Sequence, residues 1–101
     1  MNPCQCRLSV VGSAKDLKAF CQRERWPAAF TEIELLERSS SRASWQFTTP
    51  NPPLTFLRLL ATRWPLLSFL VDHDTGRVKG LAWLRGGKME HHQVVYRGGG
   101  P

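Results

Sequence analysis

The sequence predicts an α+β fold, and three observations within residues 44–74 carry that prediction. Apolar and polar side chains alternate in the first part of this stretch, which places Trp45 and Phe47 on one face of an extended strand. A run of prolines then ends the strand, and an apolar stripe with helical spacing occupies residues 54–64. Residues 66–71 are short and apolar, which is typical of a buried strand.

A strand, a helix and a second strand are expected ahead of that stretch. Residues 5–11 alternate as a strand does, and Ser13 is a good N-cap for a helix that runs to about Arg25, with Asp16 in its first turn. Residues 30–38 hold glutamates that suit a helix, but apolar side chains alternate with them. We therefore expect a strand that forms a hairpin with the strand around Trp45.

The chain after the central helix should add strands to the same sheet. Residues 72–76 form a polar turn rich in Asp and Gly, and residues 77–85 form a strand paired back on the one before it. Residues 93–96 are expected as a short last strand, and residues 98–101 as a flexible tail.

This order predicts a ferredoxin-like β-α-β-β-α-β two-layer sandwich with an added C-terminal β-hairpin strand. Two helices then cover one face of an antiparallel sheet and leave the other face open. Residues 1–97 form a single domain, and residues 98–101 lie beyond it. The expected core contains the following side chains: Leu8, Val10, Leu17, Phe20, Trp45, Phe47, Leu57, Leu60, Trp64, Leu67, Phe69 and Val71.

Length, net charge and cysteine content limit the classes of protein to which this chain can belong. A chain of 101 residues has room for one domain, and its net charge of +6 favours contact with an anionic surface such as nucleic acid or an acidic protein. Three cysteines are an odd number, so we expect free thiols rather than a disulfide framework. No apolar run is long enough to span a membrane and the start lacks a secretion signal, which predicts a cytoplasmic location.

A succession of motifs occupies the second half of the chain: Trp45-Gln46-Phe47-Thr48-Thr49, then Pro52-Pro53, then Trp64-Pro65-Leu66-Leu67-Ser68-Phe69-Leu70, and Gly80. This succession resembles the YubB-type ferredoxin-like domain family of plasmid and phage proteins. The Asn-Trp-Gly-Thr-Lys motif that such proteins carry before the threonine strand is missing, and residues 39–42 stand in its place. The resemblance implies the fold and an origin in a mobile element, and it carries over no catalytic residue.

Two motifs that suggest catalysis have simpler interpretations. Asp74-Thr75-Gly76 is the triplet of aspartic proteases, but those enzymes are all-β dimers, and the same residues are favoured in a hairpin turn. A nucleophilic Cys21 with His73 as its base is disfavoured, because Cys21 falls on the apolar stripe of its helix, where a buried thiol is inert.

A zinc site is the third chemical candidate. Cys4, Cys6, His91 and His92 have the ligand types that zinc prefers, but Cys-x-Cys and adjacent histidines are poor spacings for one tetrahedral site. Residues 98–100 lack the strand and helix that a phosphate-binding glycine loop needs. We therefore expect no catalytic residue, no cofactor and no metal.

A basic strand offers the most specific prediction of a binding site. An aromatic ring among cationic side chains is how sheets bind single-stranded nucleic acid, whereas the simpler interpretation is a solvated sheet face whose basic stems cover the ring. The predicted partner or nucleic-acid binding residues are Arg7, Arg77, Lys79, Trp83, Arg85 and Lys88. RNA-recognition domains carry aromatics on the central strands, where this chain has Arg7, Ser9, Ser44, Gln46 and Thr48.

Three functional hypotheses follow in order of preference. The first is a small non-catalytic module that engages a protein or nucleoprotein partner, for example as an anti-CRISPR-like inhibitor of a host defence complex. The second is direct binding of single-stranded DNA or RNA. The third, a cysteine- or metal-dependent enzyme, has the least support. A dimer formed through the exposed edge of residues 30–38 is an open alternative for the oligomeric state.

Overall fold

Two helices and six strands follow one another in residues 3–96, the part of the chain that the computed structural model describes. In chain order they are β1 (Cys4–Val11), α1 (Ala14–Arg23), β2 (Thr31–Arg38), β3 (Arg42–Thr49), α2 (Leu54–Arg63), β4 (Ser68–Asp74), β5 (Val78–Arg85) and β6 (Lys88–Val95). The predicted α+β class is confirmed. The expected tail, residues 98–101, lies outside the described residues.

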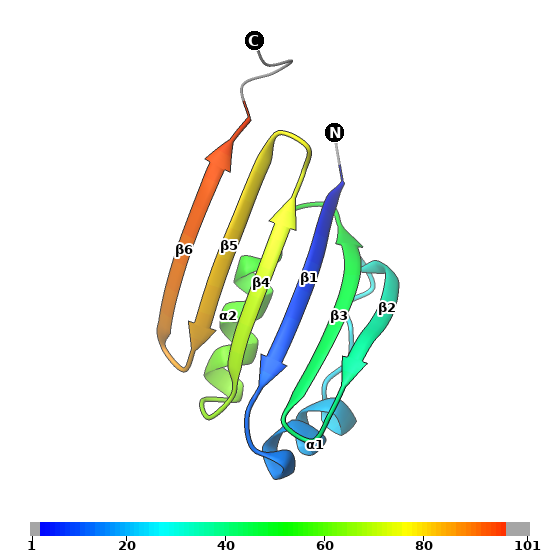
Figure 1. The fold of residues 1–101 in the computed structure, drawn as a ribbon, viewed down its shortest axis with the longest axis vertical. Helices are drawn as coiled ribbons and strands as arrows, with labels where there is room; N and C mark the ends of the chain where they lie inside the picture. The colour runs from blue at the N-terminus through cyan, green and yellow to red at the C-terminus, as the bar shows by residue number, and fades with distance from the viewer. Residues whose placement is uncertain (1–2, 97–101) are drawn as a thin grey trace.

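All six strands belong to one antiparallel sheet. Its hydrogen-bonded order is β2-β3-β1-β4-β5-β6, so β1 lies near the middle between β3 and β4, and β5 and β6 extend the sheet beyond β4. Both helices lie behind the sheet in the view of Figure 1, with α2 across β4 and β5 and α1 near one end of β1 and β3. The sheet therefore has a helix side and a side that faces away from the helices.

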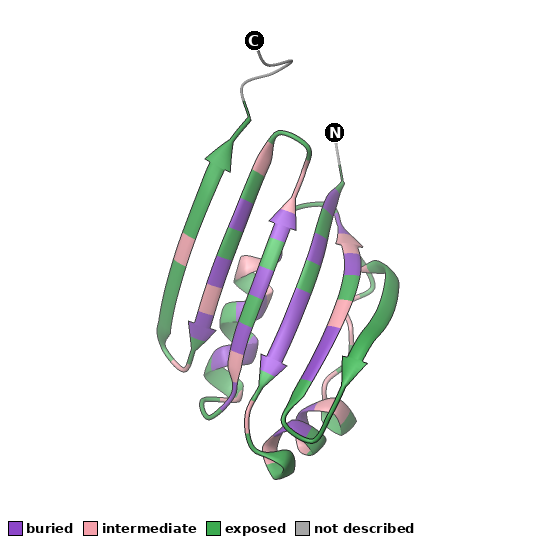
Figure 2. Ribbon diagram, viewed as in Figure 1, coloured by how far each residue is buried: buried purple, intermediate pink, exposed green. Residues whose placement is uncertain are grey.

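Alternation along the strands separates these two sides (Figure 2). In β1 the buried Cys4, Cys6, Leu8 and Val10 point to the helix side, because successive side chains of a strand point to opposite faces. β4 follows the same rule, with Phe69, Val71 and His73 buried on the helix side. The core is consequently a single layer between sheet and helices.

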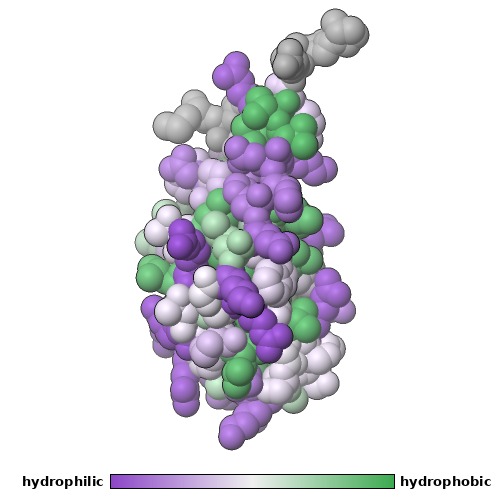
Figure 3. Space-filling model, turned by 90° about the vertical axis from the view of Figure 1, so that its left-hand side faces the viewer, coloured by the Kyte–Doolittle hydropathy of each residue, from purple (hydrophilic) through white to green (hydrophobic). Residues whose placement is uncertain are grey.

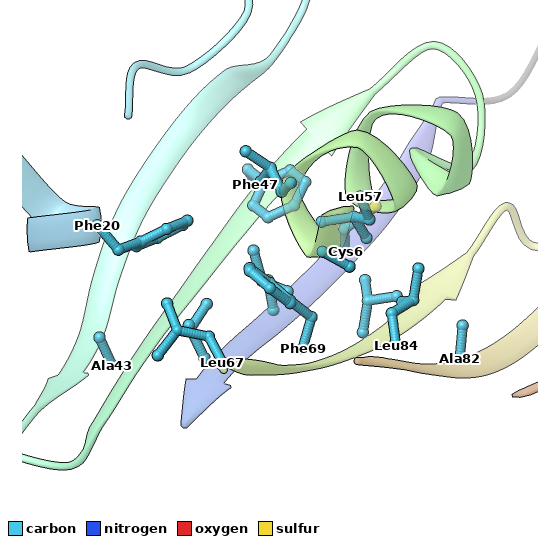
Figure 4. Packing of buried hydrophobic residues seen from close by; sticks show 14 of the residues in the cluster. Cys6, Phe20, Ala43, Phe47, Leu57, Leu67, Phe69, Ala82 and Leu84 are labelled. Atoms are coloured by element: carbon cyan, nitrogen blue, oxygen red, sulfur yellow. The ribbon is translucent and has the colours of Figure 1, made fainter. Parts of the chain in front are cut away.

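The core side chains come from both helices and four strands. Figure 4 shows Leu57 of α2 and Phe20 of α1 directed toward the layer that holds Phe47 and Phe69. The helical stripe of α2 explains this arrangement, since Leu57, Leu60 and Ala61 share one face and are all buried. The predicted core residues lie there, with Trp45 and Trp64 only partly buried against it.

A continuous cluster of aromatic rings fills the end of the core nearest α1. The Phe30 and Phe47 rings stack at 5.1 Å, and Phe20 meets Phe69 edge-on at 5.6 Å. Pairs of this kind add to the energy of burial. The cluster contains Phe20, Trp26, Phe30, Trp45, Phe47, Phe56, Trp64 and Phe69.

The first helix begins as predicted and ends earlier. The Ser13 hydroxyl caps it by accepting a hydrogen bond from the Asp16 N–H at 3.2 Å. The helix stops at Arg23 rather than near Arg25, because Glu24 already has an extended backbone. The Glu24 carboxylate accepts a 2.6 Å bond from the indole N–H of Trp64, which ties the end of α1 to the end of α2.

Two strand boundaries differ from the prediction. The strand expected at residues 66–71 is β4, which runs from Ser68 to Asp74, so most of the expected polar turn at residues 72–76 belongs to it. The strand extends through residue 73 because His73, although polar, is buried on the helix side with only 1% of its surface exposed. The turn itself is shorter and includes Gly76, whose φ of 85° favours glycine.

The last strand is longer than expected. Residues 93–96 were the predicted strand, whereas β6 spans Lys88–Val95 and pairs with β5 along its whole length. Its sequence lacks a strong burial signal, and His91 is the only residue of β6 that is not exposed. None of the helices in residues 3–96 is long and apolar enough to cross a membrane.

Candidate binding face of the sheet

The side of the sheet that faces away from both helices is called here the open face. Side chains of directly opposed residues in an antiparallel pair point to the same side, so the strand register defines this face. It contains Gln5, Arg7, Ser9, Val11, Arg42, Ser44, Gln46, Thr48, Ser68, Leu70, Asp72, Asp74, Lys79, Leu81, Trp83, Arg85, Lys88, Glu90, His92 and Val94. The hydroxyls of Ser9 and Ser44 bond to each other at 2.9 Å, which satisfies the two buried polar groups at its centre.

An apolar patch lies on the open face where β4 and β5 meet. Leu70 is directly opposite Trp83, and Leu81 is the next residue of β5 on the same face. Leu70 and Leu81 are 40% and 48% exposed, whereas Trp83 is half-buried. Val11 of β1, 41% exposed, lies diagonally beyond Leu70. We call these four residues the apolar patch, and grouped exposed apolar side chains of this kind often mark interaction sites.

A basic pair borders the apolar patch. Arg85 and Lys88 face each other across the β5–β6 hairpin, and Arg85 is the next open-face residue after Trp83. The register therefore places Trp83, Arg85 and Lys88 on the same face of the sheet. A ring and two cations in this order could contact a carboxylate-rich protein surface or a phosphate backbone.

The other two basic strand residues lie among carboxylates. Arg7 is directly opposite Asp72, and Lys79 is directly opposite Asp74. A shallow polar depression of about 330 Å³ is found at this end, lined by Gln5, Cys6, Arg7, Gln46, Asp72, His73, Asp74 and Lys79. Opposite charges side by side weaken the local field, so the cationic character of the open face concentrates at Arg85 and Lys88.

Arg77 was expected as the first residue of the basic strand, and it lies one residue before the observed start. The strand begins at Val78, and Arg77 lies in the turn that precedes it. Its backbone carbonyl accepts a 2.6 Å hydrogen bond from the N–H of Tyr96. This bond lies next to the Val78–Val95 pair, so Arg77 continues the β5–β6 pairing by one residue.

An acidic border on the opposite edge of the sheet was not foreseen. The Gln46 amide donates to the Glu34 carboxylate at 2.7 Å, and the Thr48 hydroxyl donates to the Glu32 carboxylate at 3.0 Å. Glu37 forms an exposed ion pair with Arg42 at 3.6 Å. The signal in the sequence was the set of glutamates, but only the β2–β3 pairing places them on this face.

The two edges of the sheet differ in how well they could pair with another strand. β2 has two register irregularities, and Glu32 has a positive φ of 54°, both of which disturb an edge that could otherwise add a strand. β6 is regular throughout. Figure 3 looks onto the β6 edge, where hydrophilic side chains cover most of the surface and apolar ones gather toward the C-terminal end. Val94 and Val95, 65% and 60% exposed, belong to that end of the strand.

The cysteines lie on the helix side, away from the open face. The Cys4 and Cys6 sulfurs are 3.6 Å apart and buried, and all three cysteines are free thiols. Burial raises the pKa of Cys6 to about 12, and burial also raises the pKa of Cys21. These thiols remain protonated at neutral pH. The geometry therefore gives the nucleophilic-cysteine hypothesis no activated thiolate.

Thiol labelling of the folded protein should distinguish the three cysteines. We expect an aromatic disulfide reagent at pH 8 to modify only Cys21, slowly, because Cys4 and Cys6 are 0% and 4% exposed. All three should react at once in guanidinium. The Cys21→Ser variant should lose the reaction of the folded protein, as judged by peptide mass spectrometry. Equal labelling of Cys6 in the folded state would contradict this burial.

The four residues considered for zinc do not converge. His91 and His92 point to opposite faces of β6, and within residues 3–96 no cluster of three or more His, Cys, Asp or Glu side chains could hold a metal ion. His91 instead meets His73, with their Nε2 atoms 3.0 Å apart. Burial, and to a smaller extent the neighbouring His91, lowers the pKa of His73. Sequence reasoning missed this pair because its members are 18 residues apart and separated by a strand.

Asp74 stabilises the turn after β4, as its position before Thr75 and Gly76 predicts. Its carboxylate accepts a 2.7 Å hydrogen bond from the Gly76 N–H, while the Thr75 hydroxyl accepts one from the Val78 N–H at 3.0 Å. These bonds close a hairpin turn between β4 and β5. The Asp74-Thr75-Gly76 triplet therefore stabilises the hairpin turn between β4 and β5.

Comparisons with protein-family models, with curated proteins and with solved structures found no match.

Proposed function

We propose that the protein is a non-catalytic binding module whose open face docks onto a protein or nucleoprotein partner. The observation that carries this proposal is the apolar patch around Trp83, which is flanked by a basic pair on one side and by paired charges on the other. Protein interfaces commonly place a few aromatic and aliphatic anchors inside a polar rim, with Trp and Arg supplying much of the binding energy.

A ferredoxin-like core is the structural part of this proposal. Within the six-strand order, β4-β1-β3-β2 are consecutive neighbours, and α1 and α2 connect them as a split β-α-β unit would. The complete sheet order differs from that of a four-stranded sheet because β5 and β6 are added next to β4. These added strands supply Trp83, Arg85 and Lys88, so the proposed binding residues come mainly from the extension.

The resemblance to mobile-element proteins suggests the kind of partner. We propose a component of a host defence complex, which the protein would inhibit by occupying its surface. A cytoplasmic location belongs to the same proposal, and the three free thiols support it because oxidising compartments favour disulfides. A positive net charge of +6 fits an acidic partner surface or one that already carries nucleic acid.

Trp83→Ala should weaken binding to the partner at least about 30-fold, corresponding to about 2 kcal/mol for the loss of a central aromatic anchor. The partner would first be captured from a bacterial lysate with tagged protein, identified, purified and titrated by calorimetry. Leu59→Ala is the matched control, since Leu59 is an exposed apolar residue of α2 on the other side of the sheet. Equal loss of affinity in both variants would contradict docking through the open face.

Direct binding of single-stranded nucleic acid is the second candidate, favoured by the proximity of Trp83 to Arg85 and Lys88. The carboxylates opposite Arg7 and Lys79 count against a long phosphate-binding track. The same variants separate the two candidates when labelled oligonucleotides replace the partner. A binding constant that falls steeply with salt and is lost in Trp83→Ala would favour nucleic acid, whereas absence of oligonucleotide binding would leave the protein partner.

A further inference from the structure

Two imidazole rings meet on the helix side of the sheet, remote from the open face. His73 belongs to β4 and His91 to β6, and they approach each other across the intervening strand β5. Their Nε2 atoms are 3.0 Å apart, and their ring centroids are 5.2 Å apart with the planes tilted by 47°. Both rings therefore present the same nitrogen to a shared point.

Gly80 provides the space in which the two nitrogens meet. It is directly opposite His73 in the sheet register, and a Cβ at this position would overlap the His73 ring at Nε2 and Cε1. The same Cβ would lie 3.1 Å from Nε2 of His91. The two imidazoles thus converge over the one residue of β5 that has no side chain.

The hydrogen bonding of His73 is incomplete in the protein alone. The side chain is 1% exposed, and its Nδ1 is buried without a hydrogen-bond partner. Either tautomer leaves one buried ring nitrogen unpaired, which is a costly state for a polar group. In the tautomer with its proton on Nδ1, His73 presents the lone pair of Nε2 toward His91.

We propose that His73 and His91 form a two-imidazole site for a divalent transition-metal ion such as Zn²⁺ or Ni²⁺. Imidazole nitrogens suit these ions, and zinc–nitrogen bonds of about 2.1 Å at a tetrahedral angle hold the two nitrogens about 3.4 Å apart. The observed 3.0 Å requires only a small opening of the pair. Coordination through Nε2 places the ring proton of His73 on Nδ1, so the ion replaces the hydrogen bond to His91 and leaves Nδ1 as it is.

Solvent can reach the histidine pair from the His91 side. His91 is only half-buried and its strand forms the edge of the sheet, so water or a ligand from another molecule can reach the ion. Residues 3–96 supply no further clustered ligand, so the ion binds more weakly here than in a closed structural zinc site.

Metal titration of the purified protein tests this site. Protein treated with a chelator and dialysed is melted with increasing NiCl₂, and separately with ZnCl₂, in a Cys21→Ser background that removes the accessible thiol. At about one hundred times Kd the melting temperature should rise by about 10 °C. The His91→Gln variant should lose this shift and His92→Gln, on the opposite face of the same strand, should keep it.

Calorimetry at pH 7.5 gives a second readout, with one ion expected per chain for the parent and for His92→Gln. Circular dichroism establishes that both variants are folded, which is expected because each side chain reaches solvent. No metal response in the parent, or an equal response in His91→Gln, would overturn the proposal and leave the pair as a hydrogen bond between two imidazoles.

Discussion

Phe69→Ala is expected to lower the free energy of unfolding by about 3–5 kcal/mol, the usual cost of removing a large aromatic side chain from a core. Phe69 is 0% exposed, belongs to β4 between β1 and β5, and packs edge-on against Phe20 of α1. It therefore holds the sheet and the first helix together. Urea unfolding followed by tryptophan fluorescence measures the change.

Leu66→Ala is the control for this experiment, because Leu66 is three residues earlier and 65% exposed. We expect its free energy of unfolding to stay within about 0.5 kcal/mol of the parent value, as for most surface substitutions. If the two variants lost similar amounts of stability, the assignment of Phe69 to the helix side of β4 would be wrong.

Gly80→Ala should destabilise the protein by about 1–3 kcal/mol, the range for overfilling a packed site. The added methyl group would overlap the buried His73 ring, which cannot move toward solvent. Gly87→Ala provides the comparison, since a Cβ there would meet nothing within 4 Å. Denaturation midpoints of both variants give the difference directly.

A double-mutant cycle sharpens this second prediction. In a His73→Ala background the methyl group at position 80 loses its overlap with the imidazole ring and keeps only the 3.1 Å approach to Nε2 of His91, so the same substitution should cost less than it does in the parent. An unchanged cost would mean that the His73 ring does not lie over Gly80. The cycle also separates the geometry of the pair from its ability to bind metal, which the titration measures independently.

The sequence was most informative where side-chain period and backbone chemistry agreed. The alternation at Trp45 and Phe47 predicted β3, which begins three residues earlier than Trp45, and the helical stripe after Pro53 predicted α2 nearly to its ends, because one face of each is buried. β6 gave no comparable signal, since an edge strand exposed on both sides has no need to alternate.

The features that define the sites depend on pairing between distant strands. The strand through Asp74 was mistaken for a turn because the burial of His73 depends on Gly80, which no local pattern reveals. The opposition of Arg7 with Asp72, and of Arg85 with Lys88, likewise follows from register. Local patterns therefore predicted which residues carry charge and apolar surface, but not how they are combined on the open face.

Chemical-shift mapping by NMR tests the central claim most directly, with the purified partner added to isotope-labelled protein. Docking through the open face predicts that the largest changes fall on the apolar patch and its border, which are Val11, Leu70, Leu81, Trp83, Arg85 and Lys88. Resonances of α1 and of the exposed side of α2 should change little. Large changes confined to the two helices, with the open face unaffected, would contradict the account.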